Sequence, residues 1–341
     1  MENNQDPRKD ALTQWLRDEL GHAIDDLRLA SSDASFRRYF RATLAQQSFI
    51  VMDAPPPMED VRPFVKVAAL LRNAGTQAPA VHAMDEPRGF LLLDDFGSDS
   101  YLDRLDPHSA DVLYGDALNS LLRLQKGVNI QQTDLPPYDE TLLRNEMNLF
   151  RDWFVGKLLG LHLAPDEQAI LDQTWQILID SALEQPSVCV HRDYHSRNLM
   201  VTEQDNPGVL DFQDAVIGPI TYDLVSLLRD CYIAWPQERI DAWVNDYRLA
   251  LIDHELLPPR MNQQIFMRWF DLMGVQRHLK AVGIFSRLKL RDGKSGYLGD
   301  IPRTLNYITG VAERYPELTD FLALLQQRIL ETAKASLGQA A

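Results

Sequence analysis

The chain has 341 residues and is acidic, with 34 Lys and Arg against 49 Asp and Glu and a formal net charge of −15. This balance argues against a general nucleic-acid binder and against adhesion to an anionic membrane, because both need basic surfaces. Two cysteines cannot build a disulfide framework or a zinc site, and neither a signal peptide nor a membrane-spanning apolar stretch is evident, so we expect a cytoplasmic protein.

The first part of the chain mixes helical and strand patterns. Apolar residues at helical spacing and turn residues between apolar runs predict, in order, a helix capped by Asp10 and ended by Gly21, strands over 35–44 and 47–53, a helix over 59–73 and a buried strand over 90–93. After Asp106 the helical period dominates. A first helix runs toward Gly127, and others are predicted over 138–159, 165–184, 220–234, 236–254, 260–290 and 316–335. A β-containing first part and a helical second part indicate an α+β fold.

The most informative segment is His191-Arg192-Asp193-Tyr194-His195-Ser196-Arg197-Asn198, followed by Asp211. An apolar run over 187–190 leads into it, so the segment begins at the end of a strand. Phosphoryl transfer needs one carboxylate to accept or orient the proton of the attacking hydroxyl, and oxygen ligands for magnesium. Asp193 suits the first role, and Asn198 and Asp211 suit the second.

The spacing between the two candidate magnesium ligands supports this interpretation. Leu199-Met200-Val201 and Val209-Leu210 are short apolar runs, and the residues between them, 203–208, are rich in turn formers. A hairpin over this stretch would fold Asn198 and Asp211 back toward one point. The combination is a strong signal for a phosphotransferase, whereas a lone His-x-Asp would be a weak one.

Residues 191–200, together with Asp211-Phe212-Gln213-Asp214 and residues 218–224, resemble the aminoglycoside phosphotransferase and choline kinase superfamily. The resemblance implies a bilobal protein-kinase-like fold, with a small β-containing N-lobe over 1–93 and a larger, mainly helical C-lobe over 94–341. Segments 34–41, 51–56, 93–97 and 274–280 are similar to the bacterial kinases that phosphorylate the anomeric hydroxyl of N-acetylmuramate and N-acetylglucosamine in peptidoglycan recycling. This similarity spans roughly residues 12 to 335. It implies ATP and Mg²⁺ as co-substrate and cofactor and a sugar as acceptor, with no obligate protein partner.

The resemblance also suggests residues that bind the nucleotide. Ser35 lies in the segment that corresponds to the phosphate-covering loop of protein kinases, and Leu93 and Asp95 lie in the segment that corresponds to the adenine-binding hinge. Kinase-like folds usually carry a lysine on the third strand, but Phe49-Ile50-Val51-Met52-Asp53 has none. The arginines of the preceding strand could supply the missing positive charge, and they alternate between the two faces of that strand. We expect the substitute for the lysine to come from the Arg37-Arg38 segment, and of the two we prefer Arg38, because an arginine can grip two phosphate oxygens.

The remaining candidates support the loop or bind the acceptor. His191 is expected to support the loop structurally, and Asp223 either accepts hydrogen bonds from its backbone or caps the following helix. Glu146 and Trp153 offer the mixture of carboxylate and aromatic ring that sugars bind, although Trp153 at helical spacing also suits a core. Arg277 would suit a lactyl carboxylate or, equally, a buried ion pair.

Two other functions stay open. A kinase of a cationic acceptor, such as choline or an aminoglycoside, is compatible with the acidic charge and with an aromatic cage built from tryptophans. A catalytically silent nucleotide-binding module would explain the missing lysine. The intact Asp193, Asn198 and Asp211 favour the sugar kinase over the silent module.

Overall fold

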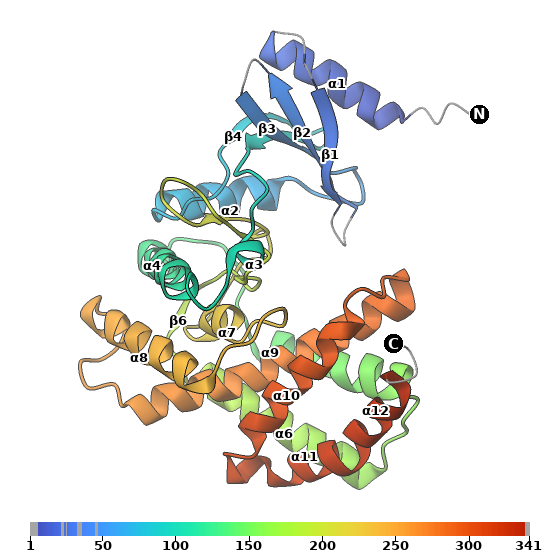
Figure 1. Cartoon of the computed structure of the whole chain (residues 1–341), viewed down its shortest axis with the longest axis vertical. Helices are drawn as coiled ribbons and strands as arrows, with labels where there is room; N and C mark the ends of the chain where they lie inside the picture. The colour runs from blue at the N-terminus through green and yellow to red at the C-terminus, as the bar shows by residue number, and fades with distance from the viewer. Residues whose placement is uncertain (1–5, 22–23, 25, 33–35, 45–46, 338–341) are drawn as a thin grey trace. The chain divides into compact units, whose positions relative to one another are not determined.

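The computed structural model describes residues 6–21, 24, 26–32, 36–44 and 47–337, which fold into two compact units (Figure 1). The first unit comprises Met1–Val128 and Arg197–Asp214. The second comprises Asn129–Ser196 and Ala215–Ala341. Each unit is therefore built from two separate stretches of the chain.

The first unit contains a five-stranded antiparallel sheet in the order β1-β2-β3-β5-β4. Its strands are β1 (Asp26–Ser32), β2 (Arg38–Leu44), β3 (Gln47–Asp53), β4 (Val81–Asp85) and β5 (Phe90–Asp94). Three of them lie where the sequence predicts strands, whereas β1 and β4 were not predicted. Both of these form the edges of the sheet and are interrupted by polar residues, four of seven in β1 and two of five in β4, so neither sequence has a continuous apolar run.

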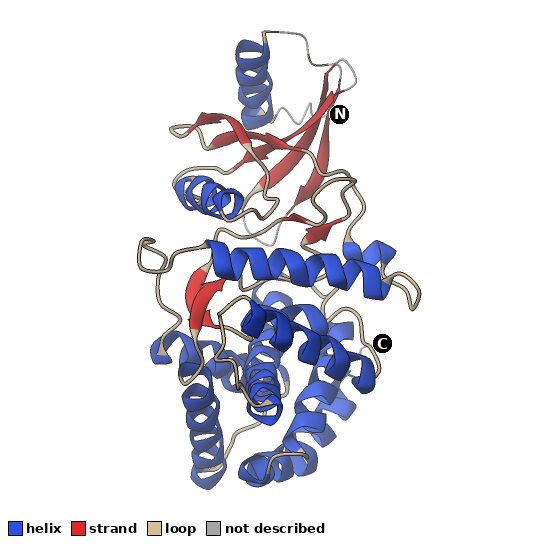
Figure 2. Cartoon of the chain, turned by 90° about the vertical axis from the view of Figure 1, so that its left-hand side faces the viewer, coloured by secondary structure: helices blue, strands red, loops and turns tan. Residues whose placement is uncertain are grey.

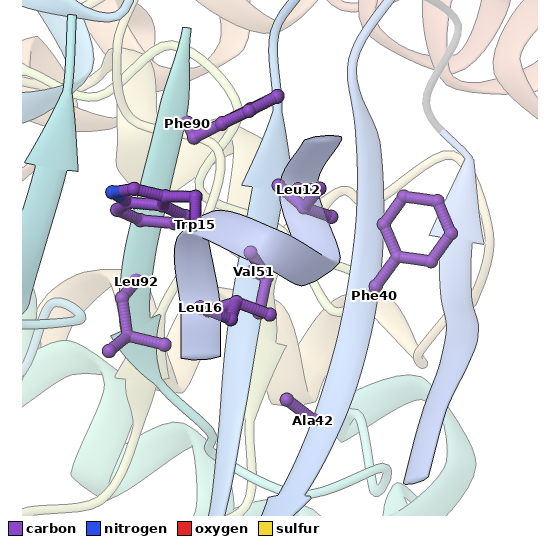
Figure 3. Close-up of a cluster of buried hydrophobic side chains, with 8 residues drawn as sticks. All are labelled: Leu12, Trp15, Leu16, Phe40, Ala42, Val51, Phe90 and Leu92. Atoms are coloured by element: carbon purple, nitrogen blue, oxygen red, sulfur yellow. The ribbon is translucent and has the colours of Figure 1, made fainter. Parts of the chain in front are cut away.

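Helix α1 (Pro7–Leu20) covers one face of this sheet (Figure 3). Its cap is Asp6, whose carboxylate accepts the backbone N–H of Lys9, so the predicted cap at Asp10 is wrong by one turn. Pro7 occupies the first helical position, where its fixed φ favours helix initiation. Leu12, Trp15 and Leu16 pack on sheet residues that include Phe40, Val51 and Leu92.

Helix α2 (Arg62–Asn73) lies beside the opposite face of the sheet (Figures 1 and 2). Its buried side chains, Phe64, Val67, Ala68 and Leu71, follow the helical period, as the sequence predicts. The ring of Phe64 lies 4.7 Å, centroid to centroid, from that of Phe212. The short α3 (Tyr101–Arg104) and the long α4 (Ala110–Gly127) complete the helices of this unit.

The predicted hairpin between Asn198 and Asp211 is present, and it belongs to the first unit. Strands β7 (Leu199–Met200) and β8 (Gly208–Val209) pair antiparallel, and the N–H of Leu210 donates to the carbonyl of Asn198 at 2.9 Å. The structure thus divides the chain elsewhere than the expected boundary after residue 93. Backbone bonds explain the difference, because Val201 N donates to Asp99 O at 2.8 Å and Val209 N to Gln77 O at 2.7 Å.

The second unit is mainly helical, and its two strands, β6 (Ser187–Val190) and β9 (Val216–Pro219), pair antiparallel. Its helices are α5 (Glu140–Leu149), α6 (Pro165–Leu183), α7 (Tyr222–Leu228), α8 (Gln237–Asp253), α9 (Gln263–Asp292), α10 (Ile301–Ala312), α11 (Thr319–Leu324) and α12 (Glu331–Leu337), with π-helical turns over Phe150–Leu158 and Leu325–Leu330. Helix α9 packs against α5, α6, α7, α8 and α10, which explains why it is buried on almost every side along its middle.

Four predicted helices differ in detail. The helix predicted over 220–234 is the shorter α7, which ends at Leu228. The helix over 138–159 begins at Glu140 and continues as a π-helix from Phe150, and the stretch 316–335 is divided into a 3-10 turn, α11, a π-helical turn and α12. Helix α4 begins at Ala110 rather than at Pro107. Helix α10 was not predicted. Within the described residues, no helix is long and apolar enough to cross a membrane.

Candidate active site

A cavity of about 410 Å³ opens in the first unit, lined by residues of the sheet and by Phe64 of α2. Cavities of this size commonly hold small molecules. Tyr39 and Arg41 of β2, Ile50 of β3 and Leu93 of β5 line it from the sheet. The remaining lining residues come from β1, from α2, from the segment before β4, from the end of β5 and the segment after it, and from the hairpin region; these are Ala30, Phe64, Pro79, Asp94, Asp95, Phe96, Gly97, Ser98, Arg197, Asn198, Met200, Leu210 and Asp211.

Both predicted magnesium ligands lie together at this cavity. The Nδ2 atom of Asn198 is 3.5 Å from Oδ2 of Asp211, and the second carboxylate oxygen of Asp211 accepts a hydrogen bond from Gln213 Nε2 at 2.9 Å. Both side chains are half-buried. Asp211 has a φ of +61°, a left-handed conformation that is uncommon for residues other than glycine.

Side chains from distant parts of the first unit hold the hairpin in place. Asn206, at its tip, donates through Nδ2 to the Tyr101 hydroxyl and to Asp116 Oδ2, both at 2.8 Å. A Cβ atom on Gly208 would lie 2.4 Å from the ring of Phe96, so only glycine fits there. Because both ends of the hairpin are fixed, the positions of Asn198 and Asp211 are fixed as well.

Both predicted hinge residues, Leu93 and Asp95, line the cavity, whereas Ser35, predicted in the phosphate-covering loop, lies outside the described residues. Leu93 contributes from β5, and the almost fully buried Asp95 carboxylate accepts two hydrogen bonds from Arg41, at 2.6 and 2.9 Å. Burial disfavours the charged form of Asp95, but the bonds from Arg41 outweigh it and keep its pKa below the usual value. Ser35 is not among the described residues.

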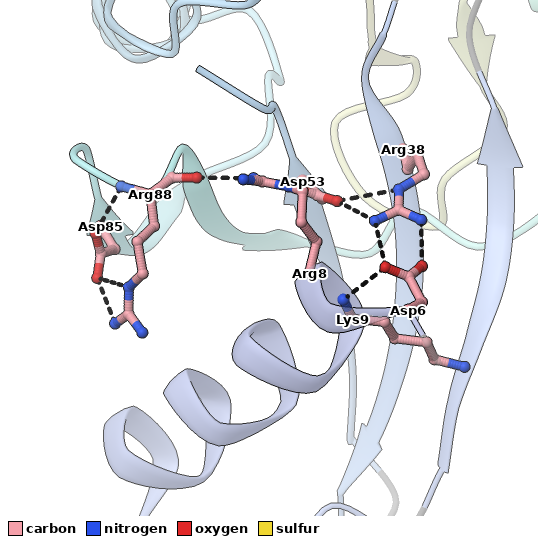
Figure 4. A network of polar contacts seen from close by, with 7 residues as sticks. All are labelled: Asp6, Arg8, Lys9, Arg38, Asp53, Asp85 and Arg88. Atoms are coloured by element: carbon pink, nitrogen blue, oxygen red, sulfur yellow. Dashed lines mark hydrogen bonds and ion pairs between the residues drawn. The ribbon is translucent and has the colours of Figure 1, made fainter. Parts of the chain in front are cut away.

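Arg38 lies on the sheet face that α1 covers, opposite the face that lines the cavity. Its guanidinium pairs with Asp6 at the start of α1 and with Asp53, its partner across β2 and β3 (Figure 4). Asp53 is fully buried and also accepts a hydrogen bond from Arg8 Nε at 2.8 Å. This arrangement ties α1 to the sheet, so the geometry argues against a nucleotide-binding role for Arg38.

Asp193 lies in the second unit, in the loop after β6. Its side chain is half-buried. Burial opposes the ionisation of Asp193, but the positive charges of Lys280 and Arg277 and the nearby histidines outweigh it and hold its pKa below the usual value. Asp193 is therefore a carboxylate at neutral pH, the form that can accept a proton.

Asp223 and His191 hold the backbone of this loop. The two carboxylate oxygens of Asp223 accept the backbone N–H groups of His191 and Arg192, at 2.7 and 3.0 Å. His191 is fully buried, and its Nδ1 lies 3.2 Å from the backbone nitrogen of Asp193. Arg192 has a φ of +78°, so the loop turns sharply just before Asp193. Of the two roles considered for Asp223, the structure shows contact with the loop backbone.

Glu146, a candidate sugar ligand, is instead occupied by protein partners. Its carboxylate accepts hydrogen bonds from Tyr138, Arg192 and Gln276 and forms an ion pair with Lys280 at 3.1 Å. Lys280 also donates to the Tyr222 hydroxyl at 2.9 Å. Burial raises the pKa of Glu146, but Lys280 and Arg192 outweigh it and hold the pKa below its usual value. The geometry therefore assigns Glu146 to the support of the loop through Arg192.

The two other candidate acceptor ligands also lie in the second unit. Trp153 is half-buried in the π-helical turn after α5, and the ammonium of Lys157 lies 3.5 Å from its ring centroid. Arg277 is 6% exposed on α9, where its NH1 lies 3.8 Å from Cys231 Sγ, and the charge of Asp193 acts on it. Both side chains remain candidates for binding the acceptor.

The sequence interpretation missed the partners that hold these groups. Lys280, Tyr138 and Tyr222 were not singled out, although Lys280 ends one of the segments that carry the resemblance. Arg41 was noted only as a charge on the second strand. The contacts of Arg41 with Asp95 and of Lys280 with Glu146 join residues 54 and 134 positions apart, and local spacing gives no signal for such contacts.

The donor set at the cavity fits a magnesium ion. Mg²⁺ prefers oxygen ligands, is usually bound through one or two carboxylates plus phosphates, and keeps several waters. Asp211 offers a carboxylate and Asn198 an amide oxygen, side by side and half-buried, so water and phosphate can approach. These two residues would hold the ion.

The model of the phosphotransferase enzyme family matches residues 26–260, and the chain belongs to this family. An ADP-bound aminoglycoside phosphotransferase has a similar structure, with a TM-score of 0.60 at 15% identity over 89% of this chain and 97% of the other. The predicted fold class, α+β and protein-kinase-like, is confirmed by this likeness.

Among proteins of known function, the chain is similar to N-acetylmuramate/N-acetylglucosamine kinases. The one from Pseudomonas putida is 47% identical over 332 residues, which cover 94% of this chain and 97% of the relative. The one from Pseudomonas aeruginosa is 51% identical over 297 residues, covering 87% of this chain and 86% of the relative.

Proposed function

We propose that this protein is an ATP-dependent kinase of N-acetylmuramate and N-acetylglucosamine. The observation that carries the proposal is the combination of 47% identity to such a kinase over nearly the whole chain with an intact set of Asp193, Asn198 and Asp211. The anomeric hydroxyl is the proposed acceptor. The product would be a sugar phosphate that feeds peptidoglycan recycling in the cytoplasm, where ATP is available.

In the proposed mechanism, Asp193 accepts or orients the proton of the acceptor hydroxyl. The positive charges of Lys280 and Arg277 keep it ionised, and Asp223 fixes the backbone just before it. A positioned base of this kind accelerates proton transfer by about 10²–10⁴-fold. The rest of the rate enhancement in phosphoryl transfer comes from positioning and from charge stabilisation.

The cavity of the first unit is the proposed nucleotide site. The backbone of Leu93 and Asp95 would bind the adenine edge, while the Asp95 side chain stays hydrogen-bonded to Arg41. Asn198 and Asp211 would hold Mg²⁺, which would neutralise part of the charge on the nucleotide phosphates. An aminoglycoside phosphotransferase of similar structure has been solved with ADP bound, which supports this assignment.

The test is ATP turnover with N-acetylmuramate, N-acetylglucosamine, choline and kanamycin, each with Mg²⁺ and with excess EDTA. We expect Mg²⁺-dependent turnover with the two sugars and none with the cations. The phosphorus–proton coupling of the purified product identifies the phosphorylated hydroxyl. Product phosphorylated at C6 would contradict the anomeric assignment alone.

The same panel separates the alternatives. Turnover with choline or kanamycin but not with the sugars would establish a kinase of cationic acceptors. ATP binding without turnover of any acceptor would indicate a silent nucleotide-binding module. Asp193→Asn serves as the inactive control in every assay, because it keeps the size of the side chain and removes the base.

A further inference from the structure

The first unit must neutralise phosphate charge without a lysine on β3, whose sequence is Gln-Ser-Phe-Ile-Val-Met-Asp. The neighbouring strand β2 offers two arginines, and each is bound by carboxylates. Arg38 pairs with Asp6 and Asp53 on the α1 side of the sheet. Arg41 lines the cavity but is held by Asp95 and by the carbonyl of Gly97, at 2.7 Å.

Arg37, which immediately precedes β2, is placed differently. Its guanidinium lies between two carboxylates, with NH2 3.9 Å from Asp211 Oδ1 and Nε 3.8 Å from Glu59 Oε2. The side chain is only 11% exposed. Asp211 lines the cavity and is the proposed magnesium ligand, so Arg37 is a buried cation beside the place where phosphate and metal would meet.

Glu59 connects this cation to the backbone. It lies just before α2, and its Oε1 accepts the backbone N–H of Phe36 at 3.0 Å, while Oε2 faces Arg37. The carboxylate thus holds both the arginine and the chain that carries it. In protein kinases a strand lysine grips the phosphates and pairs with a glutamate of the adjacent helix. Here the cation is Arg37, the residue before β2, and the carboxylate is Glu59, in the segment before α2.

We propose that Arg37, positioned by Glu59, binds the phosphates of the nucleotide beside Asp211 and so replaces the absent lysine. The inference rests on the proposed function. An arginine suits this position, because its planar guanidinium can bind two phosphate oxygens at once and stays charged next to two carboxylates. Its charge also offsets the repulsion between Asp211 and the phosphates.

The test measures equilibrium binding of ATP, ADP and adenosine by calorimetry, with Mg²⁺, to the whole chain. Charge-assisted hydrogen bonds of this kind correspond to about tenfold to hundredfold in affinity. We expect Arg37→Ala to weaken ATP and ADP binding by at least about tenfold and to leave adenosine binding unchanged, and Arg37→Lys to retain part of the affinity. Arg62→Ala is the matched control, since Arg62 is 70% exposed and pairs with Asp60 in the same region. It should bind all three ligands as the wild type does.

A double-mutant cycle tests whether Glu59 acts through Arg37. Glu59→Gln should weaken ATP binding in the wild-type background and have no further effect when Arg37 is already alanine. ATP affinity within twofold of wild type in Arg37→Ala, or an equal loss of adenosine and ATP binding in both Arg37→Ala and Arg37→Lys, would overturn the inference. A wild-type chain that binds no adenine nucleotide would contradict the proposed function itself.

Discussion

Glu146 in the second unit and Asp211 in the first show two ways of holding a carboxylate. Glu146 is buried and meets Tyr138, Arg192, Gln276 and Lys280, so its charge is fully occupied by protein. Asp211 is half-buried in a left-handed turn, 3.5 Å from Asn198 and 3.9 Å from Arg37.

This difference distinguishes a carboxylate that supports the fold from one that can bind a ligand. Buried charges need partners, because an unpaired charge in the interior is costly, and a group in this position cannot also serve a ligand without losing those partners. A half-exposed carboxylate among looser contacts keeps lone pairs available for a metal. We therefore expect substitutions in the buried network around Glu146 to lower stability first, and substitutions around Asp211 to lower ligand affinity first.

Asp193→Asn should have the largest effect on catalysis. Removal of a positioned base lowers kcat by about 10²–10⁴-fold. The isosteric amide preserves the shape of the loop, so affinity for ATP and the melting temperature should stay near the wild-type values. Steady-state kinetics and nucleotide calorimetry on the same preparation measure both. A kcat within threefold of wild type would remove Asp193 from the mechanism.

Glu146→Ala should have the next largest effect, on stability. It leaves Arg192 and Lys280 without their carboxylate in a buried site, and breaking such a pair costs about 3–5 kcal/mol. Urea unfolding measures the change. The control is Glu140→Ala, whose exposed pair with Arg144 on α5 contributes about 0.5 kcal/mol or less. Equal unfolding midpoints for the two variants would contradict the contrast between buried and exposed carboxylates.

Asp211→Ala should lower affinity for Mg²⁺–ATP and have only a small effect on stability. Substitution of residues that merely orient metal ligands costs 10–100-fold in metal affinity, so loss of a ligand itself should weaken Mg²⁺–ATP binding by at least about tenfold. Because Asp211 is half-exposed, the main cost to stability is that of an alanine in the left-handed conformation, about 1–2 kcal/mol, which is less than the loss expected for Glu146→Ala. Magnesium titration of nucleotide binding measures the first effect. Unchanged Mg²⁺ dependence in the variant would exclude Asp211 as a ligand.

Local sequence patterns predicted the candidate residues and the elements that are close together along the chain. The segment 191–198, the hairpin after it and Asp211 lie within 21 residues, and the apolar runs and turn residues define their order. The helices that pack by one apolar stripe, such as α2, were also predicted, because their period is visible in the sequence.

Contacts between distant residues could not be predicted in the same way. Strand alternation places Arg38 and Arg41 on opposite faces of β2, but only the docking of α1 decides which face is covered and which lines the cavity. Likewise, Glu146 has a residue type that suits either a sugar or an ion pair. The choice depends on Lys280, which lies on a helix more than 130 residues away along the chain.

The smallest expected effect concerns pH and Asp223. Burial, together with the charge of Asp193, raises the pKa of Asp223 to about 7, although two backbone N–H groups oppose the shift. Below this pH Asp223 gains a proton and loses an acceptor oxygen, so it no longer holds both His191 and Arg192. Asp193 stays ionised, since its own pKa is lowered. We expect kcat to fall severalfold as the pH decreases through about 7, measured at saturating substrate.

The Asp223→Asn variant tests whether Asp223 causes this pH dependence of kcat. The amide oxygen can accept only in place of one carboxylate oxygen, so kcat should be low at every pH and the decline near pH 7 should disappear. The stability of the folded state changes with pH in the opposite direction to kcat. The folded pKa lies above the ordinary value of 3.8, so the folded state binds more protons between the two values, and stability decreases as the pH rises from about 4 to about 7. The variant should also lose this decrease in stability. If the decline of kcat near pH 7 persists in Asp223→Asn, a group other than Asp223 causes the decline.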